Sequence, residues 1–151
     1  MTRALILLLV TLLPLSALAV EFEQGELSIV TRSGDTHVIA VELAETQEQR
    51  AQGLMFREEL APMSGMLFIY PRNQVPQMWM RNTLIPLDML FLDERGQVLA
   101  TANNAVPHSE AIISPGIPAR AVLELPGDAL ERLGVQPGDR ILHPRLGGPA
   151  Q

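Results

Sequence analysis

The sequence predicts one compact α+β domain, mostly β, in which an open barrel or curved antiparallel sheet carries two short helices. Two observations support this fold class. Short apolar runs bounded by turn residues recur along the chain, and only two segments have a helical pattern. The 151 residues, 47% of them hydrophobic, are enough to bury one core. We expect the domain to span residues 20–143, followed by a flexible tail over residues 144–151.

The first 19 residues are predicted to be a secretory signal peptide. Arg3 precedes an apolar run over residues 4–13, Pro14 interrupts the run, and Ala17–Ala19 has the small-x-small form of a cleavage site. We therefore expect cleavage after Ala19, export to the periplasm or the medium, and no stable membrane insertion afterwards. Retention of the segment as an uncleaved anchor is the alternative.

The strands are predicted from apolar and β-branched runs that end at turn residues. The clearest hairpin signal is the turn Ser33–Asp35 between the first two runs, and the clearest single strand is Leu87–Leu92. Residues 103–119 contain three Pro and are predicted to be a long loop, a kind of segment that is often functional. The runs predicted to be extended are residues 27–31, 36–43, 66–70, 77–80, 87–92, 97–102, 121–125 and 140–143.

Two short helices are predicted from their end signals. Thr46 and Gln49 have the spacing of a capping box, and Gly53 is placed to end the helix that they begin. The second helix is expected over residues 128–133, where Gly134 ends it.

Charge and composition exclude several classes of partner and site. The net charge is −6 and the chain has no Lys, whereas nucleic acids and anionic membranes require clustered positive charge. The absence of Cys excludes disulfides, thiolate nucleophiles, Cys-ligated metals and lipid attachment through an N-terminal Cys. A secreted domain of this composition depends on its hydrophobic core for stability.

Six segments, in this order along the chain, resemble the family known as domain of unknown function 192, which occurs in bacteria and archaea. The resemblance covers nearly all of the chain after the signal segment and implies a compact, mostly β, often exported domain with no settled activity. It supplies no catalytic residues. Arg81 stands where Lys is common in the family. The segments are Gln52–Arg57, Gly65–Phe68, Trp79–Thr83, Leu84–Asp88, Ala119–Leu125 and Leu133–Asp139.

The segment Met78–Asp93 is the most informative candidate for a site, because it holds the only Trp and a few polar residues inside an apolar run. Trp79 beside Arg81, Asn82 and Thr83 suits a small polar ligand, a sugar or a peptide, over which the loop at 103–119 could close. The alternative is that Trp79 packs in the core while the polar residues cap a turn.

Asp88 is the most informative carboxylate. On an extended strand it shares a face with Leu90 and Leu92, so we expect it to be partly buried and paired with Arg81 or Arg120. A structural ion pair is favoured over catalysis. Glu110 and Glu124 are further candidates for a carboxylate pair, and Arg120 and Glu124 share a strand face.

A copper(I) site is the third hypothesis. Thioethers are the soft ligands available to a Cys-free exported protein, and Met78, Met80 and His108 could supply a Met–His cluster. Against this, Met is an ordinary core residue and the three His lack the spacing of ligands. Core packing is favoured.

The sequence thus predicts a non-enzymatic, cofactor-free ligand-binding or accessory module of the cell envelope, whose partner is a small polar ligand or an envelope protein. A hydrolase that uses Asp88 with a loop His is the alternative function, followed by copper handling. The expected binding residues are Trp79, Arg81, Asn82, Thr83, Asp88, His108 and Arg120.

Overall fold

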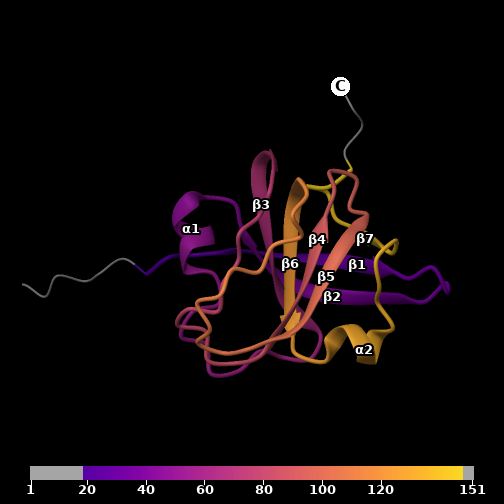
Figure 1. Ribbon diagram of the computed structural model, residues 1–151. Helices are drawn as coiled ribbons and strands as arrows, with labels where there is room; N and C mark the ends of the chain where they lie inside the picture. The colour runs from indigo at the N-terminus through magenta and orange to yellow at the C-terminus, as the bar shows by residue number, and fades with distance from the viewer. Residues whose placement is uncertain (1–18, 148–151) are drawn as a thin grey trace, which may run out of the picture.

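Seven strands form one sheet in the computed structural model, which describes residues 19–147 (Figure 1). The strand order is β5-β4-β6-β3-β2-β1-β7, and β2 pairs with β3 in parallel while the other neighbours are antiparallel. The elements are β1 (Glu23–Val30), β2 (Thr36–Ala44), α1 (Gln47–Gln52), β3 (Ser64–Gln74), β4 (Leu87–Leu92), β5 (Val98–Ala105), β6 (Ala119–Pro126), α2 (Ala129–Leu133) and β7 (Arg140–Leu142).

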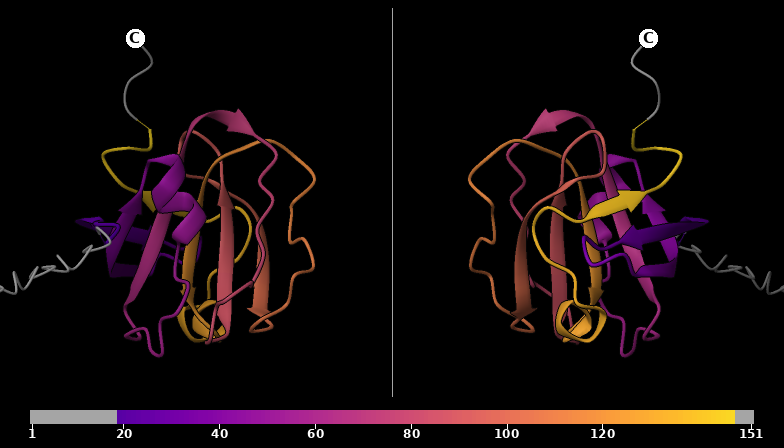
Figure 2. Two further views of the ribbon diagram at one scale, coloured as in Figure 1. Left: turned by 90° about the vertical axis from the view of Figure 1, so that its left-hand side faces the viewer. Right: turned by 90° about the vertical axis from the view of Figure 1, so that its right-hand side faces the viewer.

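The sheet curls until its two ends approach each other. β1 and β2 cross the direction of β4, β5 and β6, as Figures 1 and 2 show. A bridge joins Gln97 to Arg140, and the Ile141 N–H donates to the Gly96 carbonyl at 2.8 Å. Gly96 has φ of +77°, and a Cβ there would lie 2.1 Å from the Ile141 carbonyl oxygen, so this contact requires glycine. The predicted mostly β, curved, single-domain fold with two short helices is confirmed.

Hydrophobic residues pack on both sides of the curled sheet. The inner core draws on residues from every strand and on Leu130 and Leu133 of α2. A second layer lies on the other face of β3, β4 and β6, where it includes Phe68, Met89 and Val122. Because the central strands are buried on both faces, they appear in the sequence as continuous apolar runs.

Two long connections cover the second layer. Residues 75–86 and 106–118 run side by side, since Met78 bridges Ile113 and the Met80 N–H donates to the Ser109 carbonyl at 2.9 Å. The segment 77–80, predicted to be extended, is extended only at the Met78 bridge. The predicted strand at 66–70 lies within the longer β3.

The ends of both helices agree with the sequence. The capping box of Thr46 and Gln49 is formed in both directions, and Gly53 ends α1. Gly134, with φ of +67°, ends α2. None of the helices within residues 19–147 is long and apolar enough to cross a membrane.

The predicted signal peptide lies outside the described residues except for Ala19. The predicted tail begins at Pro144, and its first residues are packed. Leu146 is 6% exposed, and the Gly147 N–H donates to the Glu94 carbonyl at 2.8 Å. Residues 148–151 lie outside the described part of the chain.

Candidate functional site

Glu124 is a carboxylic acid in the middle of the second hydrophobic layer. Side chains alternate along β6, so Leu123 and Leu125 enter the inner core while Val122 and Glu124 face the other way. The register places Met66 of β3 and Met89 of β4 opposite Glu124, and both methionines are fully buried. Glu124 is therefore flanked by thioether side chains on both neighbouring strands, and its own side chain is 4% exposed.

A cavity of about 60 Å³ opens above Glu124, and we call it the Glu124 pocket. Residues 50–55 from the end of α1, Phe68 of β3, Glu124 of β6 and five residues of the segment 77–83 line it. Within residues 19–147, every side-chain oxygen or nitrogen that is fully shielded from solvent has a hydrogen-bond partner. Together with its place in the lining, this means that the carboxyl group of Glu124 reaches the cavity.

Burial raises the pKa of Glu124 from 4.5 to about 8, because the surrounding apolar groups disfavour the charged form. Among the described residues, no neighbouring charge or hydrogen bond counts among the causes of the shift. Glu124 is thus neutral at pH 7, and it can donate a hydrogen bond there. It can also ionise when a cation binds beside it. Carboxyl groups with a pKa raised in this way are often found at functional sites.

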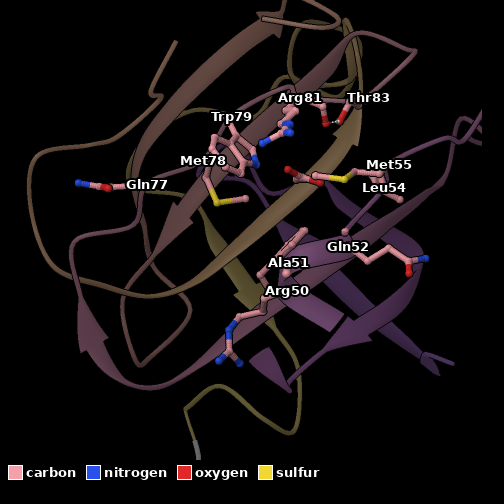
Figure 3. A pocket seen from close by; sticks show the side chains of 13 residues that line it. Arg50, Ala51, Gln52, Leu54, Met55, Gln77, Met78, Trp79, Arg81 and Thr83 are labelled. Atoms are coloured by element: carbon pink, nitrogen blue, oxygen red, sulfur yellow. Dashed lines mark hydrogen bonds between the residues drawn. The ribbon is translucent and has the colours of Figure 1, made fainter. Parts of the chain in front are cut away.

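Trp79 and Arg81 form the mouth of the Glu124 pocket. Trp79 is 44% exposed, and the guanidinium of Arg81 lies over its ring at 5.8 Å from the centroid. Arg81 also pairs with Glu110 at 3.5 Å. Met55 and Trp79 point toward each other across the opening, whereas Gln52 and Gln77 point away from it (Figure 3).

A wider hollow of about 370 Å³ adjoins the Glu124 pocket, and we call it the outer groove. The two share six lining residues, among them Arg50, Met78 and Trp79. Arg50 is held in place: its guanidinium donates to the carbonyls of Glu45 and Ile69 and lies 5.6 Å from the centre of the Tyr70 ring. The outer groove is lined by Gln47, Arg50, Ala51, Phe68, Tyr70, Gln74, Val75, Gln77, Met78 and Trp79.

Tyr70 connects the outer groove to the floor of the site. Its hydroxyl donates to the sulfur of Met78 at 3.5 Å. Burial raises the pKa of Tyr70 to about 12, an effect that Arg50 opposes and Glu124 reinforces. Tyr70 therefore remains a neutral hydroxyl at physiological pH.

Three side-chain-bearing residues adopt positive φ in the loops beside the Glu124 pocket. The φ angles are +64° at Phe56, +54° at Asn82 and +62° at His108. Backbone hydrogen bonds join the three loops: the Phe56 N–H donates to the Asn82 carbonyl at 2.8 Å, and the His108 N–H donates to the Thr83 carbonyl at 3.1 Å. Such strain is costly, above all for a bulky Phe, and it concentrates at functional sites.

Comparison with known proteins identifies the family. The model of the family DUF192, described as "Uncharacterized ACR", matches residues 28–143. The chain belongs to the DUF192 family. This match confirms the resemblance to this family in the sequence. The family description names no activity.

Two solved structures are similar to this DUF192 chain. A protein from Sinorhizobium meliloti described as a candidate transcription regulator is 47% identical, with a TM-score of 0.81, over 82% of this chain and 96% of that one. A protein of unknown function from Novosphingobium aromaticivorans is 38% identical, with a TM-score of 0.77, over 88% of this chain and 91% of that one. No curated protein matches the chain.

The structure brings together part of the predicted site of this DUF192 domain. Trp79, Arg81, Thr83 and Met78 all line the Glu124 pocket. Asn82 does not line it, although its amide points at the sulfur of Met55 at 3.9 Å.

Asp88 lies apart from the Glu124 pocket, and the expected ion pair with an arginine is wrong. Asp88 is fully buried on the inner face of β4. Its two carboxylate oxygens accept hydrogen bonds from the backbone N–H groups of Asn104 at 2.7 Å and Leu130 at 2.8 Å. Leu130 lies in the first turn of α2, whose own N-cap residue, Asp128, makes no side-chain capping bond. Asp88 therefore caps α2 from a distant part of the chain.

His108, Arg120 and Met80 also lie outside the lining of the Glu124 pocket. His108 is exposed on its loop, Arg120 donates to the Pro71 carbonyl at 2.8 Å, and Met80 is fully buried in the second layer. The alternative function was a hydrolase that uses Asp88 with a loop His, and the hydrogen-bond partners of Asp88 are instead backbone N–H groups. Within residues 19–147 no three His, Cys, Asp or Glu side chains gather in an arrangement that could hold a metal ion.

Most residues that line the Glu124 pocket were not selected from the sequence, among them Glu124, Met55, Phe68 and Arg50. The sequence predicts that Glu124 shares a strand face with Arg120, and the alternation of side chains along β6 agrees with this. The available signal was a single acidic residue inside the apolar run Ala121–Leu125. This signal alone does not indicate a pocket, because the pocket is formed by loops that cover this face of the sheet.

Proposed function

We propose that this protein is a binding module of the cell envelope, and that it holds a small polar organic molecule in the Glu124 pocket. The observation that carries the proposal is the buried Glu124 carboxyl group, which faces an open cavity and has no neutralising partner among the described residues. Buried polar groups are normally hydrogen-bonded within the fold, so an exception that faces a cavity suits a ligand.

The walls of the site support the same proposal. Ligand pockets combine apolar walls with a few placed polar groups, and the lining here includes Phe68 and Met78 together with the polar side chains of Glu124, Thr83 and Arg81. The outer groove, at about 370 Å³, falls within the range of sites for small molecules, which is roughly 300–1,000 Å³. An exposed Trp79 at the mouth offers a flat face for the body of the ligand.

Charge argues against a nucleic-acid partner for this chain, although a relative is described as a candidate transcription regulator. The net charge is −6, and the two arginines of the pocket are engaged with Tyr70, Glu110 and Trp79. Export is part of the proposal, because Arg3, the apolar run after it and the Ala17–Ala19 site form a signal pattern. N-terminal sequencing of the periplasmic protein should then begin at Val20.

A thermal-shift screen of small polar metabolites tests the binding function. A ligand at a hundred times its Kd stabilises the folded protein by about 2.7 kcal/mol, and this raises the melting temperature by several degrees. The shift should disappear in Trp79→Ala and in Glu124→Gln, and it should persist in Glu131→Gln, a control on the exposed side of α2. A screen in which no compound separates the wild-type protein from the two pocket variants would refute the proposal.

A further inference from the structure

The floor of the Glu124 pocket presents an acidic group that no described residue neutralises. The strand neighbours of Glu124 are Met66 and Met89, which carry no charge. Asp88 lies on the opposite face of the sheet. The floor is therefore a place where negative charge can form but is not compensated from within the fold.

The two arginines that line the pocket are held at its edges. Arg50 is fixed by the carbonyls of Glu45 and Ile69, and Arg81 is fixed by Glu110 and the Trp79 ring. Neither arginine lowers the pKa of Glu124, since burial is its one cause. An opposite charge within about 6 Å would have favoured the charged form. The position next to the carboxyl group is thus open to a cation from outside the chain.

We propose that the ligand carries a protonated primary amine, whose ammonium group enters the Glu124 pocket and pairs with the ionised carboxylate of Glu124. This inference rests on the proposed binding function and names the chemical class of its ligand. The remainder of the amine would extend past Trp79 into the outer groove.

The size and the lining of the pocket suit such a group. A water molecule occupies about 30 Å³ in the liquid, so a cavity of about 60 Å³ admits an ammonium group with the first methylene of its chain. The aromatic ring of Phe68 and the thioethers of Met55 and Met78 line part of this space. Aromatic faces and polarizable sulfur tolerate a cation and its methylene better than aliphatic groups do.

Binding of the amine is coupled to loss of a proton. Without ligand Glu124 holds its proton, and the ammonium stabilises the ionised form, so one proton passes to solvent for each amine bound below the pKa of Glu124. The charged and titratable groups that face the site are Tyr70, Arg50 and Arg81. Tyr70 stays neutral from pH 6 to pH 9, because its pKa is about 12. Glu124 alone therefore sets the pH dependence of the site in this range.

The probes for this inference are n-butylammonium, butyramide and butyrate, which share a chain length and differ in the charge of the head group. Trp79 is the only tryptophan and lies at the mouth, so its fluorescence reports occupancy directly. We expect n-butylammonium to bind and its Kd to be about a hundredfold smaller at pH 9 than at pH 6, because Glu124 with a pKa of about 8 must ionise. The neutral and anionic probes should bind weakly or not at all.

Matched variants complete the test. Glu124→Gln keeps the shape of the side chain and removes its charge, and it should abolish the binding of n-butylammonium, while Glu131→Gln should bind as the wild type does. Circular dichroism checks that both variants are folded. Binding that is equal in Glu124→Gln, or that does not depend on pH, overturns the inference.

The remaining outcomes separate the two proposals. If butyramide or butyrate binds in place of the amine, the amine assignment is wrong and the binding function stands. If none of the three probes changes the Trp79 signal, the amine assignment is wrong as well. The proposed binding function is refuted as well only if the metabolite screen finds no compound whose binding depends on Trp79 and Glu124.

Discussion

The buried carboxyl group of Glu124 makes the stability of the fold depend on pH in an unusual direction. In the unfolded chain Glu124 loses its proton near pH 4.5, whereas in the folded protein it keeps the proton up to about pH 8. Between these values the folded state holds more protons than the unfolded state, so stability falls as pH rises. This contribution is complete below pH 4.5 and is lost as pH rises through about 8.

The size of this effect follows from the two pKa values. Each pH unit in the interval costs about 1.4 kcal/mol, so the interval from 4.5 to about 8 corresponds to roughly 5 kcal/mol. That is a large share of the 5–15 kcal/mol typical of a domain. Glu124→Gln carries a neutral side chain of the same shape at every pH. It should match the wild type near pH 5 and exceed it by a few kcal/mol at pH 8.

Urea unfolding followed by Trp79 fluorescence measures this difference. The two proteins are compared at several values between pH 5 and pH 8, so that the titration of other groups cancels in the difference. Glu131→Gln, which changes an exposed acid on α2, should show the same change of unfolding free energy with pH as the wild type. If the difference between the wild type and Glu124→Gln is constant across this range, Glu124 is ionised normally and the description of the pocket floor is wrong.

Three substitutions outside the Glu124 pocket test the contacts that hold the sheet and helices in place, each by urea unfolding. Asp88→Asn should lose about 2–4 kcal/mol, because an amide cannot accept from both backbone N–H groups, and a loss below 0.5 kcal/mol would contradict the capping of α2. Gly96→Ala should lose about 2 kcal/mol or more, since its Cβ would collide with the Ile141 carbonyl, and wild-type stability would show that the two ends of the sheet separate freely. Thr46→Ala should lose about 1 kcal/mol, and an unchanged midpoint would mean that the capping box contributes little.

The elements that sequence reasoning placed correctly are those with local signals. The bounds of β4, Leu87–Leu92, were predicted correctly because the whole strand is apolar on both faces. Leu90 and Leu92 pack in the inner core, and Met89 and Phe91 pack in the second layer. The ends of α1 were predicted because a capping box and a glycine are separated by a few residues only.

The candidate site was harder to predict because it depends on contacts between distant segments. Asp88 was expected to be partly buried and is fully buried. Its partners are backbone N–H groups, and a sequence pattern does not reveal where those point. Glu124 becomes isolated from solvent only after residues 75–86 and 106–118 cross the outer face of the sheet. Strand alternation predicts its face but not what covers that face.

The pairing of β1 with β7 has a consequence for the order in which the protein can fold. β7 is the last strand of the chain and β1 the first, so the edge of β1 stays open until residues 140–142 are available. Contacts between such distant segments are slow to form. A chain threaded through a membrane pore from its N-terminus, as the signal pattern predicts, would complete the sheet only when nearly all of it had crossed.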